Sequence, residues 1–131
     1  VGYNTTFQRS SDLGRQMNQV FVGIPFGILR RKLKYLCEMN GIRYVEQEES
    51  YTSMASFWDL DEMPVYGEAG LVPPVFSGRR ICRGLYQDRS GRRINADVNG
   101  ALNIMRKCNI VSLRALYDRG DVDTPVRIRI A

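Results

Sequence analysis

Apolar residues follow a helical spacing in the stretch "IPFGILRRKLKYLCEMNG", residues 24–41. Leu29, Leu33, Leu36 and Cys37 recur every three or four positions and therefore fall on one face, while most of the basic residues point elsewhere. Gly41 supplies the stop signal that commonly ends a helix. This is the clearest helix that the sequence predicts.

The next stretch, "GIRYVEQEES", alternates between two faces, as is typical of a β-strand. Ile42, Tyr44, Glu46 and Glu48 share one face of this predicted strand. A helix that leads into a strand through a short glycine connection is half of a βαβ crossover, so a parallel α/β arrangement is favoured. The opening "VGYN" is interpreted as the stub of another strand.

A second helical pattern occupies "INADVNGALNIMRK", residues 94–107. Val98, Ala101, Leu102 and Met105 recur at helical spacing, and the basic residues at its end suit the negative pole of the helix dipole. Asp97 stands where this helix begins, and an aspartate there is usually a cap that accepts a backbone N–H. A carboxylate in that place could also bind a metal ion, and the spacing alone leaves both interpretations open.

The remaining stretches show weaker patterns. "SMASFWDLDEMPVYGEAGLVPPVF" (residues 53–76) holds three of the five prolines and little periodicity, which predicts an irregular insertion. "TTFQRSSDLGRQMNQ" (residues 5–19) is polar and turn-rich, so a surface loop is expected. The tail, residues 111–131, combines a short helical piece, a "DRGD" turn and a strand-like "VRIRI".

The formal net charge of +5 reflects a cluster of arginines in "SGRRICRGLYQDRSGRRI", residues 77–94. Guanidinium groups suit phosphate oxygens, and an interleaved aromatic can stack on a base. A solvated basic loop is the alternative interpretation. The glycines of the segment predict turns, and so a hairpin-like shape. The residues expected to contact nucleic acid are Arg79, Arg80, Arg83, Arg92 and Arg93.

Composition narrows the chemistry that the chain can perform. The sequence has no histidine and three scattered cysteines, so a four-ligand zinc site and the Ser-His-Asp and Cys-His mechanisms are disfavoured. Hydrolysis would have to use carboxylates and a hard cation, Mg²⁺ or Mn²⁺. No apolar run approaches the roughly 20 residues of a membrane span. We therefore expect an intracellular (cytoplasmic) protein with reduced thiols and no membrane partner.

Two adjacent carboxylates, Glu48 and Glu49, end the predicted strand. The carboxyl edge of a parallel sheet is where α/β folds place ligands. Unpaired like charges repel, so a role in metal binding and a merely structural role are about equally supported.

Two long stretches resemble the C-terminal half of TnpB/OrfB proteins, the nucleases of transposable elements, sometimes called transposases, that are related to type V CRISPR effectors. They are "FVGIPFGILRRKLKYLCEMNGIRYVEQEESYTS" and "SGRRICRGLYQDRSGRRINADVNGALNI". The resemblance implies the C-terminal portion of an RNase H-like (RuvC-like) α/β domain with an irregular insertion in place of a zinc ribbon. In that family three carboxylates bind two divalent metals that activate water.

The resemblance also assigns residues. The last family carboxylate opens the final helix in a "D-x-N-A-A-x-N-I"-like motif, which maps onto Asp97 and favours the metal over the cap. The family glutamate is replaced by Gly2, and in rearranged members the acid lies on the strand before "YTS", which implies Glu48 with Glu49 as the less favoured neighbour. Glu48 and Asp97 are then expected to lie within a few ångströms of each other. The motif continues here through Asn99, Gly100 (for an alanine), Ala101, Asn103 and Ile104.

The chain departs from the family pattern in two further ways. The first family aspartate is expected on a strand upstream of Val1, so a further N-terminal half is an expected partner. The cysteine pairs of the family's zinc ribbon are not matched, since only Cys82 stands near the second pair. No zinc is therefore expected, and the insertion should either be held by packing of Phe57, Trp58, Tyr66 and Phe76 or lean on a partner.

The sequence thus predicts four segments. They are a RuvC-like part at residues 1–53, an arginine-rich insertion at 54–94, a final catalytic helix at 95–107 and a tail at 108–131. One hypothesis is the catalytic C-terminal segment of an RNA-guided, metal-dependent DNA endonuclease, inactive alone, with DNA and guide RNA as partners. The other is a nuclease-deficient remnant, or a repurposed RNA-guided DNA-binding protein.

Overall fold

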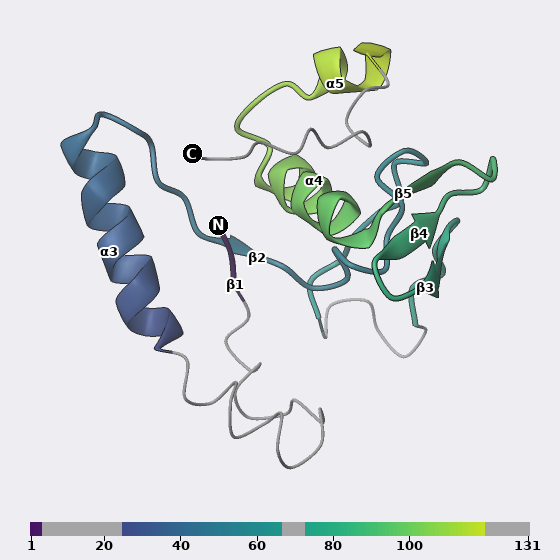
Figure 1. The fold of residues 1–131 in the computed structure, drawn as a ribbon, viewed down its shortest axis with the longest axis horizontal. Helices are drawn as coiled ribbons and strands as arrows, with labels where there is room; N and C mark the ends of the chain where they lie inside the picture. Colours follow the sequence, from purple (N-terminus) through teal and green to yellow (C-terminus); the bar gives the residue numbers. More distant parts are fainter. Residues whose placement is uncertain (4–24, 67–72, 120–131) are drawn as a thin grey trace, which may run out of the picture. The chain divides into compact units, whose positions relative to one another are not determined.

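The computed structural model describes residues 1–3, 25–66 and 73–119 (Figure 1). These residues fall into two units, each of which is described by itself. The first unit contains helix α3, and the second contains every element from strand β2 onward, together with Gly2.

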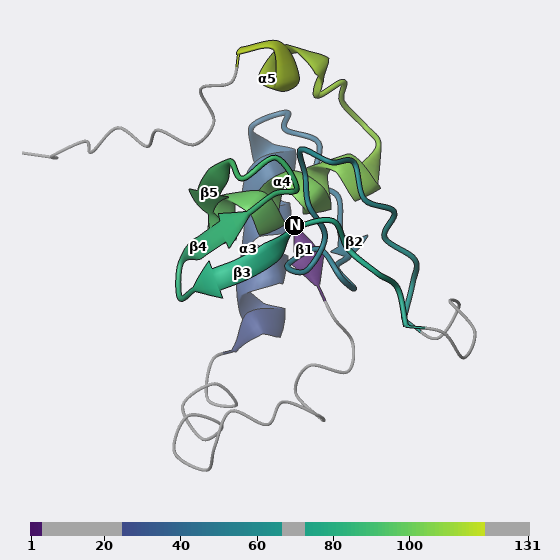
Figure 2. The ribbon, with the colours of Figure 1, turned by 90° about the vertical axis from the view of Figure 1, so that its right-hand side faces the viewer.

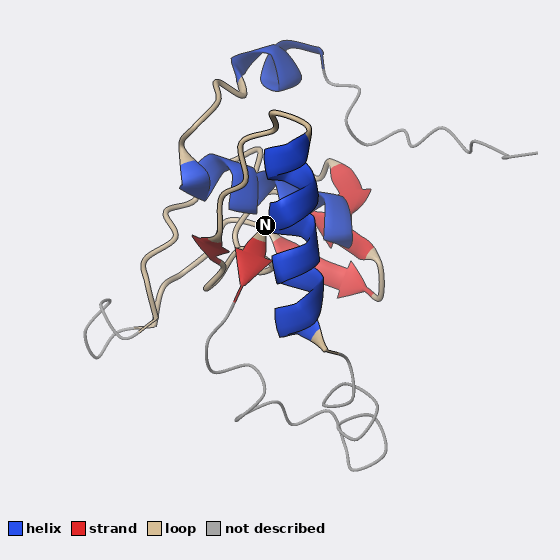
Figure 3. Ribbon diagram, turned by 90° about the vertical axis from the view of Figure 1, so that its left-hand side faces the viewer, coloured by secondary structure: helices blue, strands red, loops and turns tan. Residues whose placement is uncertain are grey.

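Helix α3 spans Phe26–Met39 and confirms the first predicted helix (Figure 3). Asn40 is its C-cap, and Gly41 follows with φ of 66°, a left-handed conformation that glycine adopts readily. None of its residues is buried in the described structure, and Leu29 and Leu36 are about half exposed. The apolar face of the helix is therefore present as predicted but uncovered.

The predicted strand from Ile42 to Glu48 is mostly wrong. Only Gln47–Glu48, strand β2, is in a sheet, and residues 42–46 have no regular structure. Strand β1, Gly2–Tyr3, is paired with β2 in a two-stranded sheet. Backbone groups need a neighbouring strand to complete a ladder, and a two-residue partner can satisfy only a short stretch.

The arginine-rich segment forms a three-stranded antiparallel sheet in the order β3-β4-β5 (Figure 2). Its strands are β3 (Arg79–Cys82), β4 (Leu85–Gln87) and β5 (Arg93–Asn95). Gly84 and Gly91, both with positive φ, lie in the connections between the strands. The predicted hairpin is confirmed. This larger sheet is antiparallel, unlike the parallel arrangement that the sequence favoured, while the mixed α/β class is confirmed.

Helix α4, Ala96–Cys108, follows β5 directly and confirms the second predicted helix to within two residues at its start and one at its end. It packs against the sheet around a small apolar core. The short helix α5, Arg114–Arg119, confirms the helical piece predicted in the tail. The predicted "VRIRI" strand and the surface loop at 5–19 lie outside the described residues. The buried apolar residues are Ala55, Phe57, Tyr86, Ile94, Ala96, Leu102 and Leu113.

Two glycines of this unit should respond oppositely to alanine. A Cβ at Gly100 in α4 would meet no atom within 4 Å, so Gly100→Ala should raise the free energy of unfolding by about 0.5–1 kcal/mol. A Cβ at Gly78 would lie 2.6 Å from the carbonyl oxygen of Gln87 and from the Tyr86 ring, so Gly78→Ala should lower it. Denaturant midpoints of both variants measure the two effects, and stabilisation by Gly78→Ala would contradict the described packing.

Candidate nucleic-acid interface and carboxylate sites

The cap of helix α4 is Asn95 and not Asp97. The Asn95 side-chain oxygen accepts hydrogen bonds from the backbone N–H groups of Asp97 (2.8 Å) and Val98 (3.2 Å). The interpretation of Asp97 as the cap is therefore wrong, because a neighbour already satisfies those donors. Asp97 lies exposed in the first turn of the helix, where a carboxylate suits the positive pole of the dipole.

Two asparagines of α4 perform a role that the sequence analysis missed. Asn99 and Asn103 are fully buried, and both donate to the carbonyl oxygen of Ala55, at 2.9 and 2.7 Å. Asn103 also donates to Thr52, and the Asn99 oxygen accepts from the Phe57 N–H at 3.1 Å. Their separation of four residues beside Leu102 was the available signal, because it places both amides on the buried face. The helix is thereby fixed against the turn at residues 52–57.

Lys107, near the other end of α4, is paired with Glu48. Its ammonium donates to the Glu48 carboxylate at 2.5 Å and to the carbonyl oxygens of Ser50 and Pro64. The Lys107 side chain is only 10% exposed. Burial alone would raise the pKa of Glu48, but hydrogen bonds from Lys107 and Ser50 lower it below its ordinary value. Glu48 is therefore a charged partner of Lys107.

Glu49 has a different environment from its neighbour. Burial, together with the charge of Glu48, raises its pKa. One of its carboxylate oxygens lies 2.7 Å from the position that a Cβ would take at Gly2, and Ile104 Cδ1 lies 2.6 Å from the same position. A side chain at position 2 would therefore overlap with Glu49. Glu49 thus lies beside Gly2, and the choice between Glu48 and Glu49 as the family acid stays a prediction.

Glu48 has its partner near the opposite end of α4 from Asp97. Glu48 contacts Lys107, which lies ten residues beyond Asp97 on α4, or about 15 Å along the helix axis. Ligands of one metal pair must converge within a few ångströms. In residues 1–3, 25–66 and 73–119 no three acidic, cysteine or histidine side chains are grouped so as to hold a metal ion. Glu48 and Asp97 therefore belong to no such group among these residues, and their role in binding a divalent cation stays a prediction.

The insertion is held by carboxylates that accept backbone N–H groups. Asp61 accepts from Ser56 (2.8 Å) and Ser77 (2.9 Å), and so ties two loops together. Burial alone would raise the pKa of Asp61, but these hydrogen bonds and the charge of Arg106 lower it below its ordinary value. Two further aspartates act similarly, since Asp59 accepts from the Arg89 N–H and Asp88 from the Arg92 N–H.

Aromatic packing accompanies these contacts. Phe57 is stacked on Tyr117 with ring centroids 4.7 Å apart, and Trp58 meets both rings edge-on. Tyr51 contacts both Tyr66 and Phe76. The expectation that these aromatic residues pack within the insertion is confirmed. Burial, helped by nearby aspartates, raises the pKa of the core residue Tyr86 to about 12, and its hydroxyl donates to the Met54 carbonyl.

The outer face of the three-stranded sheet carries arginines. Arg79, Gln87 and Arg93 are register partners across β3, β4 and β5, so they lie in one row on the same face. Both arginines are exposed. Adjacent strands lie about 4.8 Å apart, so the two guanidinium stems stand about 10 Å from each other. This spacing lets them contact separate phosphates of one strand.

The other predicted arginines divide into two kinds. Arg80 and Arg83 are exposed at the β3–β4 hairpin. Arg92 is partly buried, and its guanidinium lies 3.8 Å from the centre of the Trp58 ring. Within the described part of the chain, Arg79, Arg80, Arg83 and Arg93 form no salt bridge, whereas Arg92 has a structural role.

A short antiparallel sheet that displays arginines, packed on a helix with buried amides, defines a small basic α/β module. The chain matches the family described as "Cas12f1-like, TNB domain" over residues 26–104. It therefore belongs to that Cas12f1-like, TnpB-related family, which confirms the resemblance at that level. No curated protein and no solved structure matches it. No helix among the described residues is long and apolar enough to span a membrane.

The link through Asp61 predicts a pH-dependent loss of stability. Asp61→Asn should lower the free energy of unfolding by about 1–3 kcal/mol, because it weakens two charge-assisted hydrogen bonds. The folded-state pKa of Asp61 lies below the unfolded value, so its contribution is complete above the unfolded pKa and is lost as pH falls through the folded pKa. The difference between the two proteins should therefore shrink in acid.

Denaturant unfolding as a function of pH measures this difference. Glu62→Gln is the matched control, because Glu62 is the exposed neighbour, and it should leave the curve unchanged. A difference that grows in acid would contradict the proposed role of Asp61.

The metal chelator EDTA should leave the unfolding midpoint of the unmodified protein unchanged, since we propose that no zinc holds the insertion.

Proposed function

We propose that the chain is a nucleic-acid-binding segment of a TnpB/OrfB-like, RNA-guided DNA endonuclease, with DNA and guide RNA as partners, and that it does not cleave DNA alone. The observation that carries the proposal is the row of exposed arginines on the outer face of β3–β4–β5. Family membership supports the same class of function. The arginine side chains form charge-assisted contacts to phosphate without reading base sequence.

The placement of acidic residues supports a phosphate-binding surface. Asp59, Asp61 and Asp88 accept backbone N–H groups, Asp59 and Asp61 in part from distant loops. Within the described residues, none of the three forms a salt bridge with Arg79 or Arg93. Because Arg79 and Arg93 form no salt bridge among the described residues, they need not break such a pair before they contact the phosphates of a nucleic acid.

The proposed endonuclease role needs carboxylates that converge. Asp97 is exposed at the start of α4, and Glu49 lies beside Gly2, so each is a candidate ligand for Mg²⁺ or Mn²⁺. Glu48, the acid that the resemblance favours, has Lys107 as its partner. These positions support a site that further residues outside the described ones would have to complete.

A nuclease-deficient, repurposed binding protein is the second candidate function. The Lys107–Glu48 pair favours it, because a buried cation beside a carboxylate opposes the approach of a metal ion. The two candidates share the same nucleic-acid-binding surface. They differ in whether added carboxylates restore cleavage.

The arginine row predicts a change in the salt dependence of binding. The double variant Arg79→Gln, Arg93→Gln should weaken binding to duplexes of any sequence and reduce the slope of log K against log salt by about 2, since about one counterion is released per contact. Fluorescence anisotropy titrations across a range of salt concentrations measure it.

The double variant Arg31→Gln, Lys32→Gln is the matched control. It removes the same charge from exposed positions on α3 and should leave the slope nearly unchanged. Equal losses in both double variants would assign binding to net charge instead of the sheet. A loss confined to one target sequence would contradict a phosphate contact.

Cleavage is predicted to require residues beyond those described. The chain with Mg²⁺ and a guide RNA should leave DNA intact, because its described carboxylates do not converge. A polypeptide that supplies the aspartate-bearing RuvC-like strand in trans should restore metal-dependent cleavage, which Asp97→Ala abolishes. A nicking assay on supercoiled DNA gives the readout.

Two further variants identify the second acid in the restored complex. Glu49→Gln should abolish cleavage, while Glu48→Gln should lower it only in part, because Glu48 has Lys107 as its partner. A larger loss of cleavage in Glu48→Gln than in Glu49→Gln would identify Glu48 as the second acid. Cleavage by the chain alone, lost in Asp97→Ala, would overturn the proposal of inactivity, and no restored cleavage would favour the nuclease-deficient candidate.

A further inference from the structure

The sequence contains two Asn–Gly pairs, and one of them lies on the buried face of helix α4. The pairs are Asn40–Gly41, just after α3, and Asn99–Gly100, near the start of α4. An asparagine followed by glycine loses its side-chain amide readily, because glycine has no Cβ to hinder the approach of its backbone nitrogen. The two pairs share this chemistry, so they differ only in what the fold does to them.

The reaction needs only water. The backbone nitrogen of the glycine gives up its proton to the solvent and attacks the side-chain carbonyl carbon of the asparagine. The bond from that carbon to the side-chain nitrogen breaks, and this nitrogen takes up a proton and leaves as ammonia. Water then opens the resulting five-membered succinimide ring at one of its two carbonyl carbons. The product is aspartate, or isoaspartate, in which the main chain continues through the side chain.

The folded unit protects Asn99 from this reaction. Its side chain is fully buried, its oxygen accepts from the Phe57 N–H at 3.1 Å, and its nitrogen donates to the Ala55 carbonyl at 2.9 Å. Helical geometry also holds the backbone nitrogen of Gly100, since each interior N–H of a helix belongs to its hydrogen-bond ladder. The reaction at Asn99 therefore requires that α4 first open.

Asn40 has the opposite environment. It is exposed at the C-cap of α3, and its side-chain nitrogen donates to the Leu36 carbonyl at 2.8 Å. Gly41 follows outside the helix with φ of 66°. This pair is reached by water in the folded protein, so Asn40 serves as an internal reference for Asn99.

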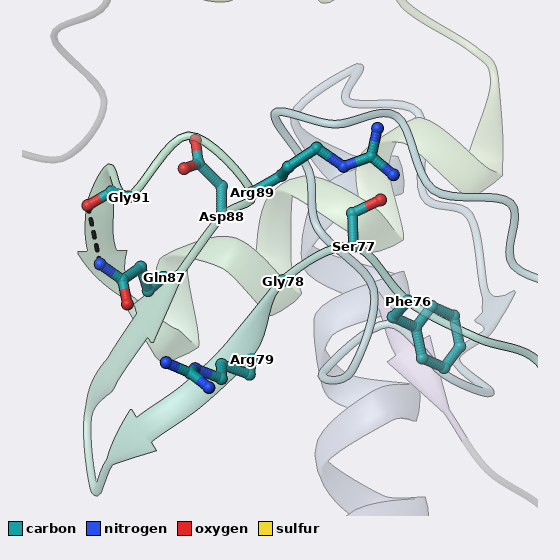
Figure 4. A pocket seen from close by; sticks show the side chains of 8 residues that line it. All are labelled: Phe76, Ser77, Gly78, Arg79, Gln87, Asp88, Arg89 and Gly91. Carbon is teal, nitrogen blue, oxygen red and sulfur yellow. Dashed lines mark hydrogen bonds between the residues drawn. The ribbon is translucent and has the colours of Figure 1, made fainter.

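The fold does not require the glycine that makes Asn99 reactive. Gly78 and Gly91, which line one pocket, are glycines that the backbone does require (Figure 4). A Cβ at Gly78 would lie 2.6 Å from the Gln87 carbonyl oxygen, and Gly91 has φ of 90°. Gly100, by contrast, lies in a regular helix, where a Cβ would meet no atom of the described residues within 4 Å. Packing therefore does not account for this glycine.

Loss of the amide would weaken the contact that fixes α4. An aspartate at position 99 still accepts from the Phe57 N–H, but it has no donor for the Ala55 carbonyl and places a negative charge beside that oxygen. Asn103 would be left as the side-chain donor to Ala55. Isoaspartate lengthens the main chain and interrupts the helical ladder. Either product therefore opposes closure of the unit.

We propose that Asn99–Gly100 is a deamidation site that is exposed when α4 opens, so that each opening carries a chance of irreversible conversion. The rate of conversion is then the rate in the unfolded chain multiplied by the fraction of molecules in which α4 is open. The lifetime of the folded unit is thereby set by its stability. This inference is independent of the proposed function, because it needs neither a nucleic acid nor a metal ion.

The test follows both pairs in one molecule. The full chain is kept in mildly alkaline buffer with and without denaturant, and conversion is measured by mass spectrometry of tryptic peptides. Trypsin places the two pairs in different peptides, residues 35–43 and 94–106. Without denaturant, Asn99 should convert at least about tenfold more slowly than Asn40, and in denaturant the two rates should agree within about twofold.

The variant Gly100→Ala tests the role of the glycine. In denaturant, where folding protects neither pair, this variant should convert Asn99 at least about tenfold more slowly, because a Cβ hinders the attacking nitrogen. Conversion of Asn40 in the same molecule should be unchanged.

A second pair of variants tests the consequence of conversion. Asn99→Asp imitates one product and should lower the denaturant midpoint, followed by the fluorescence of Trp58, the only tryptophan of the chain. Asn40→Asp is the matched control and should leave that midpoint nearly unchanged, because Asn40 is exposed and belongs to the first unit.

Each part of the inference has its own contrary result. Conversion of Asn99 in the folded protein as fast as that of Asn40 would overturn the protection by α4. Slow conversion of Asn99 in denaturant, or an unchanged rate in Gly100→Ala, would overturn the Asn–Gly site. A midpoint of Asn99→Asp equal to that of the unmodified protein would overturn the link between conversion and stability.

Discussion

The buried side-chain amides of α4 are the interaction on which the second unit depends. Asn99 and Asn103 satisfy the carbonyl oxygens of Thr52 and Ala55 in a turn that has no sheet partner. Apolar packing alone is non-directional and would allow a helix to slide, whereas directional bonds from two positions set its register. Loss of Asn103 would leave the Thr52 carbonyl without this donor, and loss of Asn99 would leave the buried Phe57 N–H without its acceptor, at about 1–3 kcal/mol each.

That register decides which polar groups meet at each end of the helix. Lys107 reaches Glu48 and the carbonyl of Ser50, and Arg106 reaches the carbonyl of Asp61. The first turn, with Asp97, is left at the opposite end. The contacts that fix the helix thus also give Glu48 its charged partner near the C-terminal end of α4.

In the insertion, the Asp61 carboxylate cross-links loops that have few apolar residues. In a zinc ribbon, a zinc ion links loops in a comparable way. Asp61 joins the backbone at Ser56 to the backbone at Ser77, across 21 positions of the sequence. A carboxylate link of this kind depends on ionisation, where a thiolate–zinc link depends on metal supply. It also has an electrostatic consequence, since acids committed to backbone donors cannot neutralise the arginines on the sheet.

Local patterns predicted the elements that local forces specify. Helices α3 and α4 were predicted by the spacing of their apolar residues and by stop signals. The β3–β4 hairpin was predicted by the glycines of the basic segment, which favour turns. The strand after Gly41 was overpredicted, because alternation describes a strand only where neighbours complete its ladder. The sequence offered Asp97 as a candidate cap and did not single out Asn95, two positions earlier, because either residue type can cap a helix. The roles of Asn99 and Asp61 depend on contacts between segments far apart in the sequence, which periodicity does not encode.

The adjacent pair Glu48 and Glu49 shows how one tertiary contact separates two chemically identical side chains. Lys107 lowers the pKa of Glu48 and keeps it charged, and that charge in turn raises the pKa of Glu49. A Cβ at position 2 would lie 2.7 Å from a Glu49 carboxylate oxygen and 2.6 Å from Ile104 Cδ1, so any side chain there would require both side chains to shift. The absence of a side chain at Gly2 and the present position of the Glu49 carboxylate are therefore linked by packing.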